Sequence, residues 1–371
     1  MCYTCYEMMV ITMIKKIIKI TACILALITL CSCDGTKVLR TKEITDKITQ
    51  TSVVTKSDIL SQEDYSIFFN DFKGSFIIPG LYEGIIPQGF CYDETTGFFL
   101  ITGYYEDGEL PSMIITVNAK DGSLAGAHPL KDINGNAYYG HAGGIASSSN
   151  TVYITSNSEC YAFPSVLLKN TENRKEIQFT SKFKLNTLGS FAAIHNNILW
   201  TGDFIESSDD EREKVSEITT LSSGETFYAY CEGYILKDGL PAVDKINSEA
   251  NGYTPDYMLA IPEQVQGMAF TKTDKIIFST SYGRKNNSVI YVYDDVLLTE
   301  KSGTKQINGE SVELFACSSN LLLNQYTAPP MAEGLAEHPD GIYLLFESGA
   351  AKYRNGGGKF PVDTAFKTTI E

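Results

Sequence analysis

The sequence predicts an all-β protein folded as a β-propeller, a ring of small sheets around a central channel. Three observations predict this fold. Short apolar runs alternate with Gly, Asn, Asp and Ser turns from Phe68 onward, no segment keeps a helical period for long, and one strand-turn-strand pattern recurs along the chain. Because each repeat buries its faces only against its neighbours, a series of such repeats favours a closed ring.

The repeated pattern is a short strand, a polar turn and a second apolar strand that ends in small or polar residues. It begins at five places, namely Pro87, His141, Gly189, Val265 and Ala332. These starts lie about 50 to 75 residues apart, a spacing that suits propeller blades built from several short strands. The repeats predict five blades, and a degenerate sixth between residues 205 and 262 stays open.

The last repeat is too short to supply a complete four-stranded blade before the chain ends. We therefore expect an N-terminal strand, within residues 65–79, to complete this blade and close the ring. Such closure leaves few free sheet edges, as propellers require. The propeller domain is predicted to span residues 65–371.

The N-terminal segment predicts export. A Lys-rich start precedes an apolar stretch from Ile20 to Leu30, which is shorter than the roughly 20 residues that span a bilayer. The ending Leu30-Cys31-Ser32-Cys33 resembles the lipobox of bacterial lipoproteins, in which a peptidase cuts before the cysteine and the thiol carries diacylglycerol. The resemblance implies that Cys33 is lipidated; a plain secretory signal is the alternative.

On this interpretation residues 1–32 are a lipoprotein signal peptide, and residues 1–12 are an extension that precedes a better-formed start at Met13. Residues 33–64, rich in Thr and charge, are predicted to be a tether. The expected location is the cell envelope, with the protein anchored to a membrane by its lipid and facing the extracytoplasmic side. Which membrane receives the anchor stays open.

The composition excludes one class of partner. The chain has 371 residues and a formal net charge of -15, with its basic residues scattered. Because binding to phosphates requires a positive patch, no nucleic-acid partner is expected. The isolated residues Cys91, Cys160, Cys231 and Cys317 read as small core residues, although disulfide pairing stays open in an exported chain.

The repeat texture over residues 65–371 resembles the secreted propellers that include NHL-repeat proteins and the gluconolactonase and calcium-lactonase group. The resemblance depends on that texture and on no invariant motif. It therefore informs the fold more than the function.

Propeller geometry places the candidate site. The start of an innermost strand and the end of the next strand emerge at the same mouth of the channel, so polar residues at these positions converge. The predicted ligand-binding residues are Gln88, Gln266, Tyr105, Arg284 and Glu347. Glycines beside the strand starts would let the backbone approach a ligand closely. The structural alternative is that these residues satisfy backbone groups in the channel wall.

A metal site and a general acid or base are also predicted at this mouth. Glu333, Asn157 and Asp203 supply oxygen ligands, which suit calcium. In the lactonase group that the chain resembles, a Glu at an inner-strand start joins Asn and Asp ligands around a divalent ion. His141 titrates near neutral pH and can assist catalysis.

Three functions follow from these observations. The first is a lipid-anchored propeller that binds a small molecule, a glycan or an envelope protein at its channel mouth, without established catalysis. The second is a calcium-dependent hydrolase of lactone or ester type. The third is a structural scaffold of the cell envelope. The sequence holds no complete catalytic constellation, so whether the protein is an enzyme stays open.

Overall fold

The computed structural model describes the chain from residue 48 to residue 371, apart from residues 62, 171–174, 207–217, 243–245 and 248–251. The predicted signal peptide and the lipidation site Cys33 lie outside the described residues. Among the helices within them, none has the length and apolar character needed to cross a membrane.

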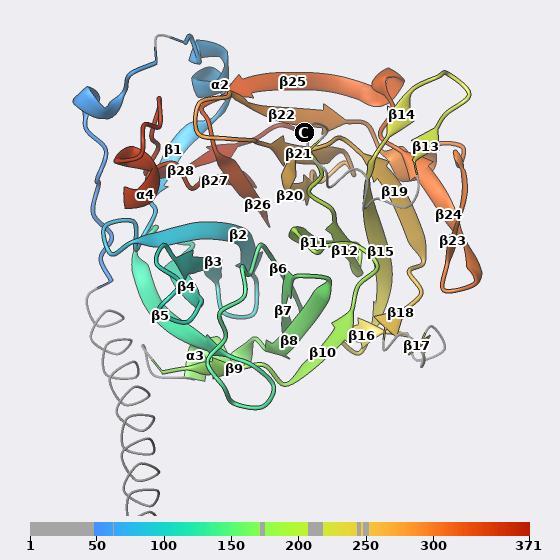
Figure 1. The fold of residues 1–371 in the computed structure, drawn as a ribbon, viewed down its shortest axis with the longest axis horizontal. Coiled ribbons are helices and arrows are strands. Elements are labelled where there is room, and N and C mark those ends of the chain that lie inside the picture. The colour runs from blue at the N-terminus through green and yellow to red at the C-terminus, as the bar shows by residue number, and fades with distance from the viewer. Residues whose placement is uncertain (1–47, 62, 171–174, 207–217, 243–245, 248–251) are drawn as a thin grey trace, which may run out of the picture. The chain divides into compact units, whose positions relative to one another are not determined.

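The described residues form a ring of β-sheets around a central axis, as Figure 1 shows. The innermost strands β2, β6, β11, β20 and β26 contact one another in that order, and β26 contacts β2 again. The ring is therefore closed, and the predicted all-β propeller fold is confirmed.

Two sheets follow one another from the N-terminal side, and each runs outward from the channel. The first comprises β2 (Ile85–Asp93), β3 (Phe98–Tyr105), β4 (Met113–Asn118), β5 (Leu124–Lys131) and β9 (Ile177–Gln178). The second comprises β6 (Gly144–Ser148), β7 (Thr151–Ser156), β8 (Glu159–Pro164), β10 (Ser181–Lys184), β18 (Gly252–Tyr253) and β17 (Ile246–Asn247).

Two further sheets continue the ring. The third comprises β11 (Phe191–His195), β12 (Ile198–Gly202), β15 (Ala229–Lys237), β19 (Tyr257–Ile261), β24 (Glu310–Ala316) and β23 (Gly303–Ile307), with β16 (Leu240–Pro241) paired to β15. The fourth comprises β20 (Val265–Phe270), β21 (Ile276–Thr280), β22 (Ser288–Tyr293) and β25 (Leu322–Ala328). A separate ribbon is formed by β13 (Thr219–Thr220) and β14 (Thr226–Phe227).

The closing sheet joins the two ends of the propeller. It comprises β26 (Ala332–His338), β27 (Gly341–Phe346), β28 (Thr364–Thr368) and β1 (Lys73–Ile77). The N-terminal strand β1 pairs antiparallel with β28, as the prediction of ring closure requires. Only part of the predicted segment is a strand, because Ser66–Asp71 forms the helix α2.

The structure corrects the predicted number of blades. Four sheets each take their inner and middle strands from one stretch of chain, and the closing sheet combines both ends. If a blade is a sheet whose inner and middle strands come from one stretch of chain, the described propeller has four blades rather than five or six. The closing sheet, built from both ends of the chain, occupies the remaining place in the ring. The described residues between 205 and 262 make no sixth blade, because β15 and β19 extend the sheet that begins with β11.

The second strands of the sheets are nearly continuous apolar runs. In β21 every residue is buried, and in β7 and β27 only the first is not. Neighbouring sheets cover both faces of these strands. Such buried positions favour β-branched and aromatic residues. Phe191, Trp200 and Phe278 belong to one such core cluster, while Phe68 of α2 and Phe72, directly after α2, belong to another.

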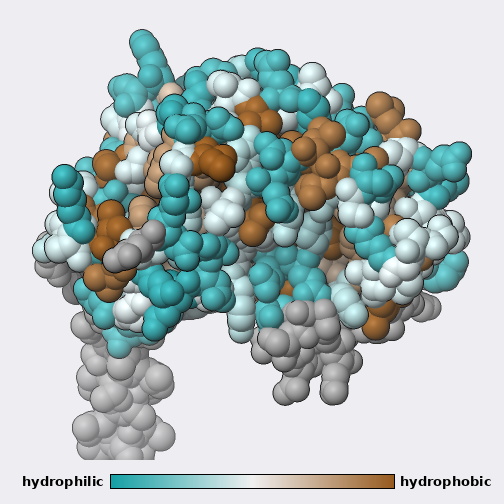
Figure 2. Space-filling model, turned by 90° about the horizontal axis from the view of Figure 1, so that it is seen from above, coloured by the Kyte–Doolittle hydropathy of each residue, from teal (hydrophilic) through white to brown (hydrophobic). Residues whose placement is uncertain are grey.

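The four cysteines of the propeller support the same view of the core. All four are buried and unpaired, as predicted for small core residues: Cys91, Cys160, Cys231 and Cys317. Figure 2 shows hydrophilic residues over most of one side of the molecule, with hydrophobic residues in small separate groups. This side therefore has the character of an ordinary water-exposed surface.

Part of the predicted tether lies against the propeller. The Gln50 amide donates to the backbone oxygens of Ile77 and Gly122 at 2.8 and 2.6 Å. The Asp363 carboxylate accepts a hydrogen bond from the backbone N–H of Val53 at 2.8 Å. Three short helices lie outside the ring strands, namely the 3-10 helix η1 (Lys56–Asp58) and the α-helices α3 (Val166–Asn170) and α4 (Ala351–Arg354). Two further 3-10 turns are η4 (Val296–Leu298) and η5 (Ser319–Leu321).

Candidate functional site

Three inner strands carry a β-bulge near their first residues. The pairing register shifts around Gln88 in β2, around Gln266 in β20 and around Glu333 in β26. The other two inner strands, β6 and β11, pair with their neighbours without a shift. A bulge leaves one residue outside the regular pairing and turns its side chain in a new direction, and bulges are frequent beside active sites.

The three bulged residues line one cavity of about 430 Å³, which we call the front cavity. It lies at the end of the channel where the inner strands begin. Its walls are formed by Gln88, Tyr104, His141, Gly143, Ser156, Asn157, Leu188, Gly189, Ser190, Phe204, Gln266, Glu333, Glu347 and Tyr353. The volume falls within the range of sites that bind small molecules.

The front cavity brings together most of the predicted site residues. The predicted residues that line it are Gln88, Gln266, Glu347, His141, Glu333 and Asn157. They come from inner-strand starts and from the ends of second strands, as the geometric argument expects.

Tyr104, rather than the predicted Tyr105, lines the front cavity. Tyr105 is buried, and its hydroxyl donates to the Met113 sulfur at 3.0 Å. Successive side chains of a strand point to opposite faces, so only one of the two tyrosines can face the cavity. This alternation could have been read from the sequence, but the choice of tyrosine could not.

Arg284 and Asp203 lie outside the front cavity. The Arg284 guanidinium donates to the Gly356 carbonyl at 3.2 Å and lies 5.0 Å from the centre of the Tyr353 ring. Asp203 accepts a hydrogen bond from the Leu188 backbone N–H at 2.7 Å. Burial raises the pKa of Asp203 to about 7. Both residues therefore contact lining residues of the front cavity, Arg284 the Tyr353 ring and Asp203 the Leu188 backbone, without lining it themselves.

The predicted calcium ligands are not assembled. Glu333 and Asn157 line the front cavity, whereas Asp203 does not. Within the described ranges no three His, Cys, Asp or Glu side chains lie close enough to hold a metal ion. The geometry therefore gives no support to the calcium site that the resemblance implied.

The centre of the front cavity is a pair of carboxyl groups. Glu333 is 2% exposed and Glu347 is 8% exposed, and the two carboxyl groups are close enough to affect each other's pKa. Burial, followed by the charge of Glu347, raises the pKa of Glu333 well above its usual range. Burial raises the pKa of Glu347 to about 7, against the lowering effect of its polar neighbours Tyr353, Glu333 and Gln88. The pair therefore holds a shared proton at neutral pH.

Gln88 connects this pair to His141. Its amide nitrogen donates to a Glu347 carboxylate oxygen at 2.9 Å and to the Pro87 carbonyl at 2.9 Å. Its amide oxygen is left to accept a hydrogen bond from His141 Nε2. His141 is accessible through the open cavity, yet burial, with a smaller effect from Lys352, lowers its pKa. His141 is therefore a neutral imidazole whose Nδ1 is an acceptor.

Two glycines beside the strand starts have a packing role in the ring. A Cβ on Gly334 would lie 2.6 Å from the Phe90 nitrogen of the next inner strand, and one on Gly267 would lie 2.8 Å from the Glu333 oxygen. These glycines let adjacent inner strands pack backbone to backbone. Gly143, beside the start of β6, lines the front cavity.

Left-handed backbone conformations occur at both ends of the channel. At the front, Gln264 at φ 63° and Met331 at φ 67° come directly before β20 and β26, and Ala142 at φ 52° comes two residues before β6. At the rear, the turns after the inner strands contain the left-handed residues Ser149, Asn196, Asn197 and Asp274. Such conformations cost on the order of 1 to 3 kcal/mol each, and their presence at both ends does not favour either cavity as the site.

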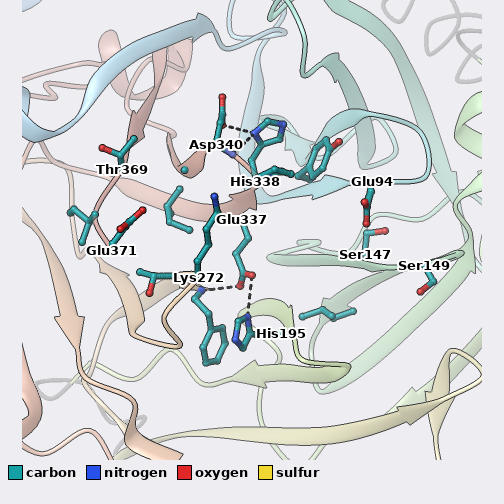
Figure 3. A pocket seen from close by; sticks show the side chains of 18 residues that line it. Glu94, Ser147, Ser149, His195, Lys272, Glu337, His338, Asp340, Thr369 and Glu371 are labelled. Carbon is teal, nitrogen blue, oxygen red and sulfur yellow. Dashed lines mark hydrogen bonds and ion pairs between the residues drawn. The ribbon is translucent and has the colours of Figure 1, made fainter.

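A second cavity of about 410 Å³, which we call the rear cavity, lies where the inner strands end. Figure 3 shows His195, Glu337, His338 and Asp340 around it. His195 donates from Nε2 to Asp274 at 2.7 Å and from Nδ1 to Glu337 at 3.3 Å. Asp274 and Glu337 thus share His195 as a basic partner.

The rear cavity and several residues of the front cavity were not predicted from the sequence. The ends of the inner strands converge at the far mouth by the same geometry that brings their starts together, so His195 and Glu337 could have been found. Tyr353 reaches the front cavity from the short helix α4, and Phe204 follows the end of β12. The sequence pattern offers no signal for Tyr353.

No protein-family model and no curated protein sequence matches the chain. Among solved structures, it resembles the glutaminyl cyclase of Myxococcus xanthus, at 11% identity over 78% of this chain and 93% of the other, with a TM-score of 0.39. It also resembles the PQQ-bound aldose sugar dehydrogenase of Streptomyces coelicolor, at 14% identity over 77% and 94%, with a TM-score of 0.38.

A third similar structure is the tail fibre of Staphylococcus aureus phage P68, at 10% identity over 81% of this chain and 52% of the other, with a TM-score of 0.40. Likenesses this weak carry no argument about function. The fold and the site define a β-propeller with a polar cavity at one mouth of its channel. The finer resemblance to NHL-repeat and gluconolactonase propellers stays a prediction.

Proposed function

We propose that the protein is a lipid-anchored, extracytoplasmic β-propeller that binds a small polar molecule in the front cavity. One observation carries the proposal: bulges in three separate strands turn Gln88, Gln266 and Glu333 into the same cavity. Each bulge interrupts a strand ladder, and continuous pairing in β6 and β11 shows that the ring does not require one.

Polar groups without protein partners support binding. Within the part of the chain that the structure describes, the side-chain amides of Gln266 and Asn157 make no hydrogen bond to protein, although both face the front cavity. Polar groups in such a site fix the orientation of a ligand. The cavity volume favours a small molecule over a glycan chain or a protein segment.

The test is a thermal shift screen of the purified full chain against sugars, organic acids, amino acids and amines. We expect at least one compound to raise the Tm of the wild type and to lose this effect in Gln266→Ala. Tyr105→Phe is the control, since Tyr105 was also predicted to bind the ligand but is buried and does not line the front cavity. An equal shift in Gln266→Ala would move the site elsewhere, and no shift with any compound would favour the scaffold alternative.

The anchor is a separate part of the proposal. It is supported by the Lys-rich start, the short apolar stretch and the sequence Leu30-Cys31-Ser32-Cys33. Cys33→Ser should prevent labelling by palmitate and release the protein from the membrane fraction. Continued membrane retention of the variant would refute lipidation at Cys33.

A further inference from the structure

The front cavity has an unbalanced charge. Among the described residues, it is lined by Glu333 and Glu347 but by no lysine or arginine. Two basic groups lie near Tyr353 outside the lining: the Arg284 guanidinium is 5.0 Å and the Lys352 ammonium 5.5 Å from the centre of its ring. An acidic pair that a protein buries without a cation is normally neutralised by protons, as this one is.

The hydrogen bonds of the pair leave one carboxyl group available. Glu347 accepts a hydrogen bond from the Gln88 amide, and Tyr353 lies close enough to lower its pKa. Within the described residues, no protein donor makes a hydrogen bond to the Glu333 side chain, whose charged neighbour is Glu347. Glu333 therefore has no N–H donor from the protein, although it is almost completely buried and faces the cavity. A ligand that brings an N–H donor would supply the missing partner.

Aromatic rings line the same cavity as the carboxyl pair. Tyr104, Phe204 and Tyr353 line the front cavity, and the Tyr104 ring lies 4.6 Å from the His141 ring. The electron-rich faces of such rings attract a cation, most strongly where water is excluded. Carboxyl oxygens together with aromatic rings form a suitable environment for an ammonium group.

We infer that the ligand of the front cavity is a small organic amine, bound as its ammonium cation against Glu333 and Glu347; this inference rests on the proposed function. The cation replaces the shared proton of the pair, which leaves to solvent, so charge is conserved: one positive charge enters and up to one proton departs. The Gln266 and Asn157 amides contact the remainder of the ligand. Anionic ligands are disfavoured, because the described lining offers them no lysine or arginine.

The experiment is isothermal titration calorimetry of the purified full chain at pH 7 and constant ionic strength. The probes are methylammonium, tetramethylammonium, putrescine and choline, with the neutral isostere 3,3-dimethylbutan-1-ol matched to choline. Each titration is run in phosphate and in HEPES, whose ionisation enthalpies differ and neither of which is a simple amine cation. We expect at least one amine to bind and to release up to one proton, and to bind at least about tenfold more tightly than a neutral isostere.

Two variants and a control locate the effect. Glu333→Gln should abolish the proton release and weaken the amine at least about tenfold, because a charge-assisted hydrogen bond is lost. Gln266→Ala should weaken binding but keep the proton release. Glu337→Gln, at the other end of the channel, should change neither.

The outcomes separate this inference from the proposed function. Binding of neutral sugars that Gln266→Ala weakens, with no amine binding, overturns the inference and leaves the proposed function standing. Amine binding without proton release, or unchanged by Glu333→Gln, also overturns it. If no probe and no compound of the thermal shift screen binds, both fail.

Discussion

The two ends of the channel have cavities of similar volume, about 430 Å³ at the front and 410 Å³ at the rear, and the same inner strands build both. They differ in how their charged groups are paired. At the rear His195 lies between Asp274 and Glu337, and Asp340 contacts both His338 and Lys367. At the front, two carboxyl groups lie next to each other without a basic partner in the described lining. Cavity size therefore does not distinguish the two ends, whereas the pairing of the charged lining groups does.

The backbone differs in the same sense. The bulges of β2, β20 and β26 lie at the front, where these strands begin, while their pairing at the rear is regular. The rear cluster joins three sheets: His195 ends β11, Asp274 lies between β20 and β21, and Glu337 lies near the end of β26. We interpret the rear cluster as a set of contacts that stabilises the ring by joining its sheets, and the front cavity as the binding site.

The largest effect is expected where the inner strands meet. In Gly334→Ala the new Cβ would lie 2.6 Å from the Phe90 nitrogen and 2.9 Å from the Gln88 oxygen, both of which are backbone atoms. We expect the free energy of unfolding, measured with urea, to fall by about 3 kcal/mol. Gly74→Ala is the control, because its Cβ would meet only the Thr364 side chain at 3.4 Å, and it should change stability by about 0.5 kcal/mol or less. An equal loss of unfolding free energy in the two variants would show that the close packing of β26 against β2 does not contribute to stability.

The next effect concerns the pH dependence contributed by the front pair. Glu347 has a folded pKa of about 7 against a reference value of 4.5. Because the folded state holds this proton more tightly than the unfolded state, its stabilising contribution is complete below pH 4.5 and is lost as the pH rises through 7. The loss is on the order of 3 kcal/mol. Unfolding of Glu347→Gln across this range should show a flatter profile, and a slope equal to that of the wild type would contradict the carboxyl pair.

A smaller effect is expected at the rear. Burial alone would lower the pKa of His195, but its hydrogen bonds to Glu337 and Asp274 outweigh burial and the net shift is upward. The stability it contributes is therefore complete below pH 6.5 and is lost as the pH rises through its folded pKa. Since Asp274 is half exposed and screened by water, His195→Gln should cost only about 1 kcal/mol at pH 6 and less at pH 9. Urea unfolding at both pH values checks this, and a larger cost at pH 9 would contradict the ion pairs.

The smallest effect on stability is expected from Gln266→Ala, which should lie within about 0.5 kcal/mol of the wild type. Its amide has no protein partner within the described chain, so removing it breaks nothing in the fold. Ser279→Ala is the matched control from the same sheet, because its hydroxyl donates to the Glu333 carbonyl at 2.5 Å. That variant should lose about 1 kcal/mol. A large loss in Gln266→Ala would make this residue a structural support and not a binding group.

The repeats predicted the ring and much of the front cavity for one physical reason. A strand-turn-strand pattern that starts at Pro87 or Val265 fixes which residues stand at the channel mouth, and Gln88 and Gln266 follow from their places in it. The closing strand was also predictable, because the last repeat lacks enough residues for its own outer strand.

Other features depend on contacts between distant parts of the chain. The bulges that aim Gln88 and Glu333 leave no mark in a single strand, since a bulge is a relation between two strands. Tyr353 lines the front cavity from α4, a helix that the repeats do not predict, and Asp203 accepts a hydrogen bond from the Leu188 backbone instead of lining the cavity. The blade count was wrong because the repeats do not show how far each sheet extends.

The most direct test of the difference between the two ends is the Tm shift that the best-binding amine produces in three proteins: the wild type, Gln266→Ala and His195→Gln. We predict a clear upward shift in the wild type and in His195→Gln, and a much smaller one in Gln266→Ala. A shift that survives in Gln266→Ala and disappears in His195→Gln would place the binding site at the rear and contradict the account.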